Sequence, residues 1–156
     1  MFVLHGDTDV VGAQEDDSLT GSAYVFTRDG GGAWTEEDKL IASDAAPFAL
    51  FGQSVSAYGD TVVVGAGYDD EVADDAGAAY VFIRGTGGAW TQQDKLTASD
   101  GAQGDGFGRS DCLCEGAGVV GAAARIEWRS RRRRERARRS RAGACHHPGW
   151  TSAGRM

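Results

Sequence analysis

The stretch GSAYVFTRDGGGAWTEEDKLIASD at Gly21–Asp44 returns as GAAYVFIRGTGGAWTQQDKLTASD at Gly77–Asp100. Corresponding positions lie 56 residues apart, and the dipeptide Phe51-Gly52 returns at the same distance as Phe107-Gly108. Agreement over most of a period indicates an internal repeat, in which each unit is one supersecondary element stacked on the next. What one such unit forms therefore decides the fold.

The repeat extends upstream of both copies. GDTDVVGA at Gly6–Ala13 corresponds to GDTVVVGA at Gly59–Ala66, with an offset of 53 residues. The difference of three residues falls in the acidic loop that follows, where a change of length is tolerated.

Each unit is predicted to form four short strands. Gln53–Tyr58 alternates polar and small apolar residues, which predicts a half-buried strand. Thr61–Ala66 and Ala79–Ile83 are continuous apolar runs, typical of strands covered on both faces. In Trp90–Leu96, alternate residues from Trp90 to Leu96 are expected to share one side, so that Trp and Leu anchor its two ends. The unit is therefore all-β.

Glycine-rich turns separate these strands. They are Gly59-Asp60, the acidic loop Gly67–Gly77 and Gly85–Gly88. Glycine accepts positive φ without strain, which is what tight turns between strands require. Four strands joined in this way correspond to the plan of a propeller blade.

The segment FGQSVSAYGDTVVVGA at Phe51–Ala66 resembles the signature of FG-GAP repeats. Phe51-Gly52 matches the FG and Gly65-Ala66 begins the GAP, while Gly67 stands where the signature has proline. The following GAAYVF…GGAW…KL is similar to bacterial-type FG-GAP repeat proteins more than to integrins. The resemblance covers about residues 3–110 and implies four-stranded antiparallel blades of a β-propeller.

The chain is predicted to hold about two such blades of an incomplete propeller. Met1 stands at the position of Ser54, so the first unit lacks its FG dipeptide, and Val119–Ala122 matches Val63–Ala66 in a third unit. Because propellers typically need four to eight blades, neighbouring blades are missing and we expect a fragment. The expected segments are a truncated first blade at 1–50, a complete blade at 51–106, the start of a third blade at 107–124 and an irregular Arg-rich tail at 125–156.

The basic tail breaks the repeat. Residues 1–110 contain nineteen Asp and Glu against five Lys and Arg, whereas residues 111–156 contain eleven Arg and four Asp and Glu. Arg136 replaces Tyr80 in the register, and His146 replaces Trp90. We expect a disordered tail or one read in a shifted frame, which an AYVF-like string in another frame would support. The alternative function is nucleic-acid or anionic-surface binding through phosphate charge.

Acidic residues of the loops are the candidate metal ligands. The resemblance implies DxDxDG-type calcium loops in some blades, whereas this chain offers adjacent carboxylates, which point in different directions on extended backbone. A calcium site and a solvated acidic turn both remain open. The candidates are Asp16, Asp17, Asp69, Asp70, Asp74 and Asp75.

Other reactive residues do not form a recognisable constellation. No GxSxG-type elbow accompanies the serines, so we expect no enzyme, and a hydrolase built on a propeller is the weakest alternative. His5 corresponds to Tyr58, which favours an aromatic strand position over catalysis. Cys112 and Cys114 are too close, and Cys145-His146-His147 too contiguous, for the usual zinc spacing.

The resemblance implies an extracellular or cell-surface module that binds a protein or carbohydrate ligand through its turns. No apolar stretch is long enough to span a bilayer. The start MFVLHGDTD lacks the basic region and apolar core of a signal peptide, so by itself it predicts a cytoplasmic chain. We expect a non-enzymatic structural or ligand-binding role.

Overall fold

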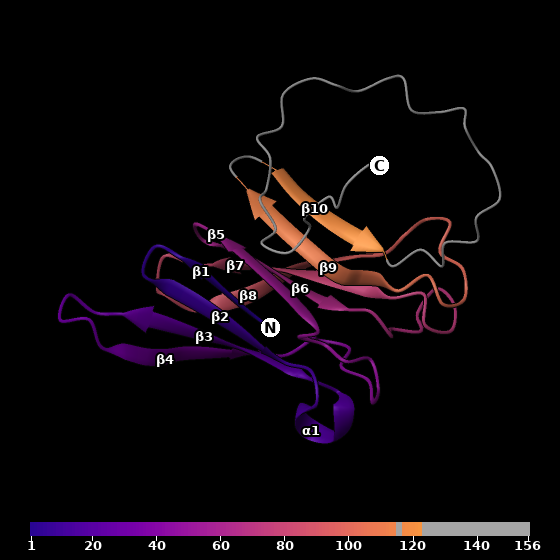
Figure 1. The fold of residues 1–156 in the computed structure, drawn as a ribbon, viewed down its shortest axis with the longest axis horizontal. Helices are drawn as coiled ribbons and strands as arrows, with labels where there is room; N and C mark the ends of the chain where they lie inside the picture. Colours follow the sequence, from indigo (N-terminus) through magenta and orange to yellow (C-terminus); the bar gives the residue numbers. More distant parts are fainter. Residues whose placement is uncertain (115–116, 123–156) are drawn as a thin grey trace, which may run out of the picture. The chain divides into compact units, whose positions relative to one another are not determined.

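A computed structural model describes residues 1–114 and 117–122 (Figure 1). They form ten strands and a single helical turn, in two four-stranded antiparallel sheets and a two-stranded sheet. The first sheet has the order β1-β2-β3-β4, the second β5-β6-β7-β8, and β9 pairs with β10. The elements are β1 Phe2–His5, β2 Thr8–Ala13, α1 Asp16–Leu19, β3 Ser22–Arg28, β4 Trp34–Leu40, β5 Ser54–Tyr58, β6 Thr61–Ala66, β7 Ala78–Arg84, β8 Trp90–Leu96, β9 Phe107–Cys114 and β10 Ala117–Ala122.

The two four-stranded sheets repeat one another in register, which confirms the predicted blade-like units. The cross-strand row Phe2, Val11, Tyr24 and Lys39 in the first sheet corresponds to the row Val55, Val64, Tyr80 and Lys95 in the second. Directly paired residues lie on one face of a sheet. We call the face that carries this row the front face of each sheet, and the opposite face its back face.

The core lies between the back face of the first sheet and the front face of the second. Val10 and Val25 on the first sheet, and Val64 on the second, are completely buried. Gly12 belongs to the back face, and a Cβ placed on it would clash with the carbonyl oxygen of Gly52 and lie 3.2 Å from the Val55 side chain. The sheets therefore approach closely at the glycine of the VVGA motif.

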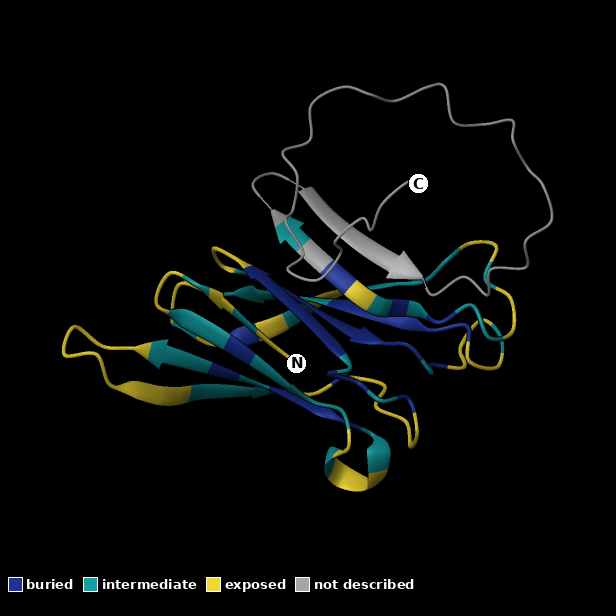
Figure 2. Cartoon of the chain, in the orientation of Figure 1, coloured by how far each residue is buried: buried dark blue, intermediate teal, exposed yellow. Residues whose placement is uncertain are grey.

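The predicted burial of β5 was wrong. Residues Ser54–Ala57 are all buried, although the alternation predicted a half-buried strand (Figure 2). The back face of β5 is covered by β9, because the Ser56 hydroxyl accepts a hydrogen bond from the Leu113 N–H at 2.6 Å. Small serines let a neighbouring strand approach, so here polar residues do not indicate a solvent face.

Strand β6 is covered on both faces, as its apolar run predicted. Val64 on its front face belongs to the core shared with the first sheet. On its back face, a Cβ placed on Gly65 would clash with the Gly108 carbonyl oxygen of β9. The described start of the third unit thus packs against the second sheet.

The predicted side assignment in β8 was wrong. A bulge makes Val81 pair with Asp94 and Phe82 with Gln92, so that one residue of β8 is left over. Trp90, Gln92 and Lys95 consequently share the front face, while Asp94 and Leu96 lie on the back. Trp90 is buried and Leu96 half-buried, so the two ends are anchored on opposite faces.

The acidic segment after β2 is not a plain turn. α1 is a single turn in which Asp17, Ser18 and Leu19 have positive φ.

The FG dipeptides follow equivalent paths, since Phe51 bridges to Gly21 and Phe107 bridges to Gly77. The expected tail at 125–156, and with it Cys145, lies outside the described residues.

Candidate functional site

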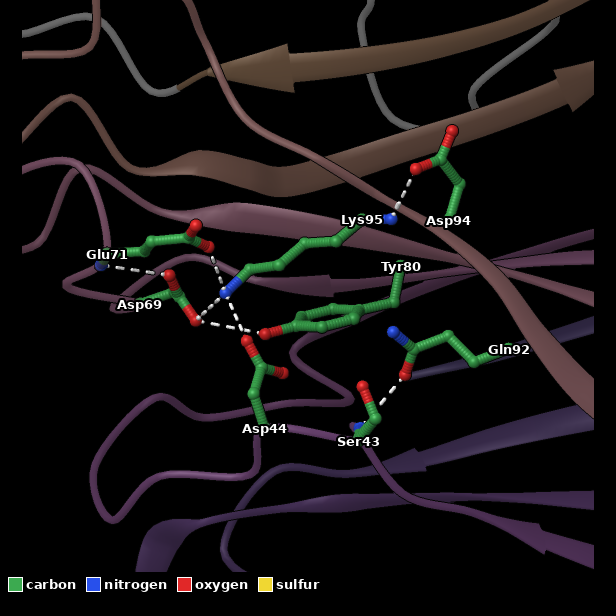
Figure 3. A network of polar contacts seen from close by, with 8 residues as sticks. All are labelled: Ser43, Asp44, Asp69, Glu71, Tyr80, Gln92, Asp94 and Lys95. Carbon is green, nitrogen blue, oxygen red and sulfur yellow. Dashed lines mark hydrogen bonds and ion pairs between the residues drawn. The ribbon is translucent and has the colours of Figure 1, made fainter.

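A cluster of charged residues lies where the first sheet meets the second (Figure 3). The Lys95 ammonium, on β8, contacts Asp44 at 2.5 Å, Glu71 at 2.7 Å and Asp69 at 3.0 Å. Asp44 lies in the linker after β4, whereas the other two carboxylates come from the loop between β6 and β7. A single lysine thus joins two repeat units.

Tyr80 contacts both Asp69 and Lys95 of this cluster. Its hydroxyl donates to the Asp69 carboxylate at 3.0 Å, and the Lys95 ammonium lies 5.2 Å from the ring centroid. The ring packs in a T-shaped arrangement with Phe51, with centroids 5.3 Å apart. Burial, reinforced by the charge of Asp69, raises the pKa of the Tyr80 hydroxyl well above its ordinary value. The hydroxyl therefore remains a hydrogen-bond donor at physiological pH.

The carboxylates keep Lys95 charged. Burial alone would lower the pKa of the Lys95 ammonium, but the contacts with Asp44 and Glu71 outweigh it and raise the pKa. For Asp44, burial opposes ionisation, and the bond from Lys95 still holds the pKa of its carboxyl below the ordinary value. Asp44 and Lys95 thus hold each other in their charged forms across the junction.

Three further polar contacts cross the same junction. Arg84 pairs with Glu37, the Trp90 backbone N–H donates to the Asp38 carboxylate at 3.1 Å, and the Ser43 backbone N–H donates to the Gln92 side-chain oxygen at 2.9 Å. The acceptors come from both units, so neither unit supplies all of the polar partners. These contacts fix the two units against each other at the rim of their apolar contact.

The first sheet carries the counterpart of this cluster. Lys39 contacts Asp16 at 2.9 Å and Asp17 at 3.2 Å, and the Tyr24 hydroxyl donates to Asp16 at 2.7 Å. The bonds from Tyr24 and Lys39 lower the pKa of the Asp16 carboxyl to about 2. In the described part of the chain, the carboxylates that pair with Lys39 come from its own unit, whereas Lys95 also receives Asp44.

Five of the six acidic residues predicted to bind metal accept other contacts, Asp16 and Asp17 from Lys39 and Asp74 from Gln103, whereas the Asp75 side chain is exposed. Asp69 accepts from Lys95, Tyr80 and the Glu71 N–H, and Asp70 accepts the Asp75 N–H at 2.7 Å. Within residues 1–114 and 117–122, no group of three or more His, Cys, Asp or Glu side chains is arranged to hold a metal ion. Calcium binding by these residues therefore stays a prediction.

Two further expectations concern His5 and membrane-spanning segments. The His5 ring contacts the Tyr58 ring, with centroids 4.6 Å apart, as an aromatic strand position would. Among the residues that the structure describes, no helix is long and apolar enough to cross a membrane.

Comparison with protein families decides what these repeated sheets are. A model of the FG-GAP repeat matches residues 34–82 and again residues 90–129, together more than half of the chain. The chain belongs to the FG-GAP repeat family. The second match extends to residue 129, whereas the resemblance visible in the sequence ends at about residue 110. A search of curated proteins found no match.

Each FG-GAP match begins at the tryptophan of an outer strand and runs through the linker into the next sheet. The linker that carries Asp44 and Phe51 is therefore part of the unit that the family model describes rather than a spacer. Sequence reasoning missed Asp44 and Lys95 as partners. The available signal was that Lys39 and Lys95, the two lysines of the chain, lie 56 residues apart, as Tyr24 and Tyr80 do.

Removing the Lys95 ammonium tests how much the charged cluster stabilises the contact between the two FG-GAP units. We expect Lys95→Met to destabilise the fold by about 1–3 kcal/mol, because three carboxylates lose their cation while the site keeps some access to water. Lys39→Met, at a more exposed lysine, is the matched control and should cause a clearly smaller loss. Urea denaturation followed by tryptophan fluorescence measures both, and equal losses would contradict a junction role.

A second buried polar contact attaches β9 to the second FG-GAP sheet. The Ser54 hydroxyl oxygen lies 2.6 Å from the Asp111 carboxyl and 2.8 Å from the Gly108 carbonyl oxygen. A hydroxyl has one proton and can donate to one of these acceptors, so a protonated Asp111 supplies the other hydrogen bond. Burial raises the pKa of the Asp111 carboxyl from 3.8 to about 6. Strands β5 and β6 beside it carry no acidic or basic residue, and Arg109 lies on its own strand.

This contact predicts a pH-dependent stability. Since the pKa of Asp111 is higher in the folded chain, the folded state binds the proton more tightly, and its contribution is complete below about pH 4 and declines as the pH rises through 6. The loss between pH 4 and pH 7 should be roughly 2–3 kcal/mol. Asp111→Asn should be more stable than the natural chain at pH 7 and equal to it near pH 4.

Urea denaturation at a series of pH values measures this profile. Asp100→Asn, at an exposed position, is the control and should leave the profile unchanged. An Asp111→Asn variant with the same pH profile as the natural chain would contradict the assignment to Asp111.

Proposed function

We propose that the chain is a non-enzymatic binding module of a propeller-type protein, acting outside the cell or at its surface on a protein or carbohydrate ligand. The observation that supports this is that the charged residues which join the two sheets are distinct from the acidic residues exposed in the loop. The junction residues Tyr80, Asp69 and Lys95 are engaged with one another, whereas Asp70 and Asp74 lie exposed in the loop between β6 and β7. A rigid pair of sheets presenting exposed loops is the arrangement that binding scaffolds use.

Charge favours a polar ligand contact at these loops. Residues 1–110 contain nineteen acidic and five basic side chains, so the acidic ones exceed the basic ones by fourteen. Such a surface attracts basic protein surfaces and repels nucleic acid. We therefore assign ligand contact to the exposed acids of the second sheet's loop rather than to the buried junction.

An oligosaccharide array and a panel of purified cell-surface proteins, probed with the labelled full chain, test the proposal. Saturable binding should weaken at least about tenfold in an Asp70→Asn, Asp74→Asn double variant, which corresponds to about 1.4 kcal/mol. An Asp29→Asn variant, whose exposed acid lies in a turn of the first sheet, is the control. Hydrolysis of a bound glycan, or binding that persists in the double variant, would contradict the proposal.

Duplex DNA is the probe for the alternative function. Salt-sensitive DNA binding by the full chain that disappears when Arg131, Arg132, Arg133 and Arg134 are replaced by serine would favour the arginine-rich segment instead. Absence of DNA binding, together with ligand binding through the acidic loop, would support the module proposed here.

A further inference from the structure

The linker between the two sheets contains a tight turn with an aromatic residue at an unusual position. The Ala49 N–H donates to the Ala46 carbonyl oxygen at 3.3 Å and closes a four-residue turn. Pro47 is the second residue of this turn, and Phe48, with a φ of 69°, is the third. Proline followed by a residue of positive φ is typical of a type II turn, whose third position favours glycine. Phe48 therefore has a backbone conformation that aromatic residues rarely adopt.

The second unit forms the same turn with glycine at this position. Its Asp105 N–H donates to the Ala102 carbonyl oxygen at 3.1 Å, and the third residue of the turn is Gly104, with a φ of 80°. Gly104 and Phe48 lie 56 residues apart, so they are corresponding positions of the repeat. Glycine adopts this conformation without strain, whereas a residue with a Cβ does not. The turn itself therefore needs no aromatic ring.

Burial does not offset the strain at Phe48, because its side chain is 66% exposed. The units on both sides of the ring are in place. The Leu50 N–H donates to the Leu19 carbonyl oxygen of the first unit, and the Tyr68 N–H of the second unit donates to the Ala49 carbonyl oxygen. Strained positions that the fold does not require occur where function requires the side chain, which points to a partner for this ring.

Exposed carboxylates flank this turn on three segments. Asp44 precedes Phe48 by four residues in the linker, Asp17 lies in α1, and Asp70 lies in the loop between β6 and β7. Asp17 and Asp44 keep 64% and 45% of their side chains exposed beside their lysine partners, and Asp70 is exposed. An exposed ring among hydrogen-bond acceptors of one charge is complementary to a surface that combines an apolar pocket with cations.

We propose that Phe48 anchors the chain to a basic protein surface. Its ring enters an apolar pocket of the partner, and the flanking carboxylates pair with lysine or arginine side chains at the rim of that pocket. Aromatic residues are enriched in the buried centres of protein interfaces, whose rims are polar. A neutral carbohydrate offers these carboxylates no cation, so a protein fits this surface better. The inference rests on the proposed binding role and names the class of its ligand.

The probe is the panel of purified cell-surface proteins described above, grouped by isoelectric point, with the labelled full chain as receptor. Saturable binding should come from the basic proteins, and its association rate should fall as salt is added, because the carboxylates steer the encounter. Phe48→Gly should weaken this binding at least about tenfold, which corresponds to about 1.4 kcal/mol. Its melting temperature should be no lower than that of the natural chain, since glycine relieves the strain. A merely structural ring would instead lower the melting temperature when removed.

Ile41 supplies the matched control, because it is an apolar residue of the same linker and is 47% exposed. Ile41→Ala should bind like the natural chain, and Phe48→Tyr, which keeps an aromatic ring, should retain most of the affinity. Unchanged affinity in Phe48→Gly would overturn the proposal. If the Asp70→Asn, Asp74→Asn variant still lost binding in that case, the proposed function would stand without this anchor. Binding confined to glycans or to acidic proteins, or absence of binding to every basic protein of the panel, would also overturn it.

Discussion

Replacing Phe51 by alanine is expected to destabilise the folded chain by about 3–5 kcal/mol. The Phe51 side chain is 1% exposed and belongs to the shared core, with its ring centroid 5.3 Å from that of Tyr80 and 6.0 Å from that of Phe82. Truncation would remove the aromatic contacts and leave a cavity that the backbone hydrogen bonds of Phe51 and Gly52 prevent from collapsing. Urea denaturation monitored by tryptophan fluorescence gives the change in free energy of unfolding.

The same linker supplies the control. Phe48, three residues earlier, is 66% exposed, so Phe48→Ala should change stability by no more than about 0.5 kcal/mol. A similar loss in both variants would mean that the linker contributes through its chain conformation and not through the buried ring.

Adding a single methyl group at Gly12 is expected to cost at least about 3 kcal/mol, the upper end for overpacking. The new Cβ would clash with the Gly52 carbonyl oxygen and lie 2.9 Å from its carbonyl carbon. These are backbone atoms, so no side-chain rotation relieves the clash and the sheets must separate. Gly12→Ala should therefore lower the melting temperature strongly, as measured by circular dichroism.

Gly30 provides the matched comparison, because a Cβ at this position meets nothing within 4 Å. Gly30→Ala should leave the melting temperature nearly unchanged. If Gly12→Ala were equally well tolerated, the close approach of the two sheets at the VVGA motif would be wrong.

Much of the fold could be predicted because the repeat supplies each strand twice. Tyr24 and Tyr80, with the same spacing to Lys39 and Lys95, fall at the same register positions in both sheets. The all-β blade class and the family followed from these pairs and from the FG dipeptides. Periodicity within one strand, however, assumes unbroken alternation, and the bulge in β8 placed Asp94 on the face opposite Trp90.

The candidate site was harder to predict because it forms between units. The acidic loop was recognised as charged, but a pattern within one repeat does not reveal that Asp44 of the preceding unit reaches Lys95. The same limit applied to Ser54, whose burial depends on β9 and on Asp111, 57 residues away. Contacts of this length are set by packing, which local alternation does not describe.

The double covering of β6 has a consequence for how the chain opens. All residues of this strand but Thr61 are buried, whereas Phe2 and Leu4 of β1 are exposed. Because each repeat is stabilised mainly by its nearest neighbours, the strand with neighbours on both sides opens only when both contacts are lost. Amide hydrogens of β6 should exchange with deuterium most slowly, and those of β1 should exchange first.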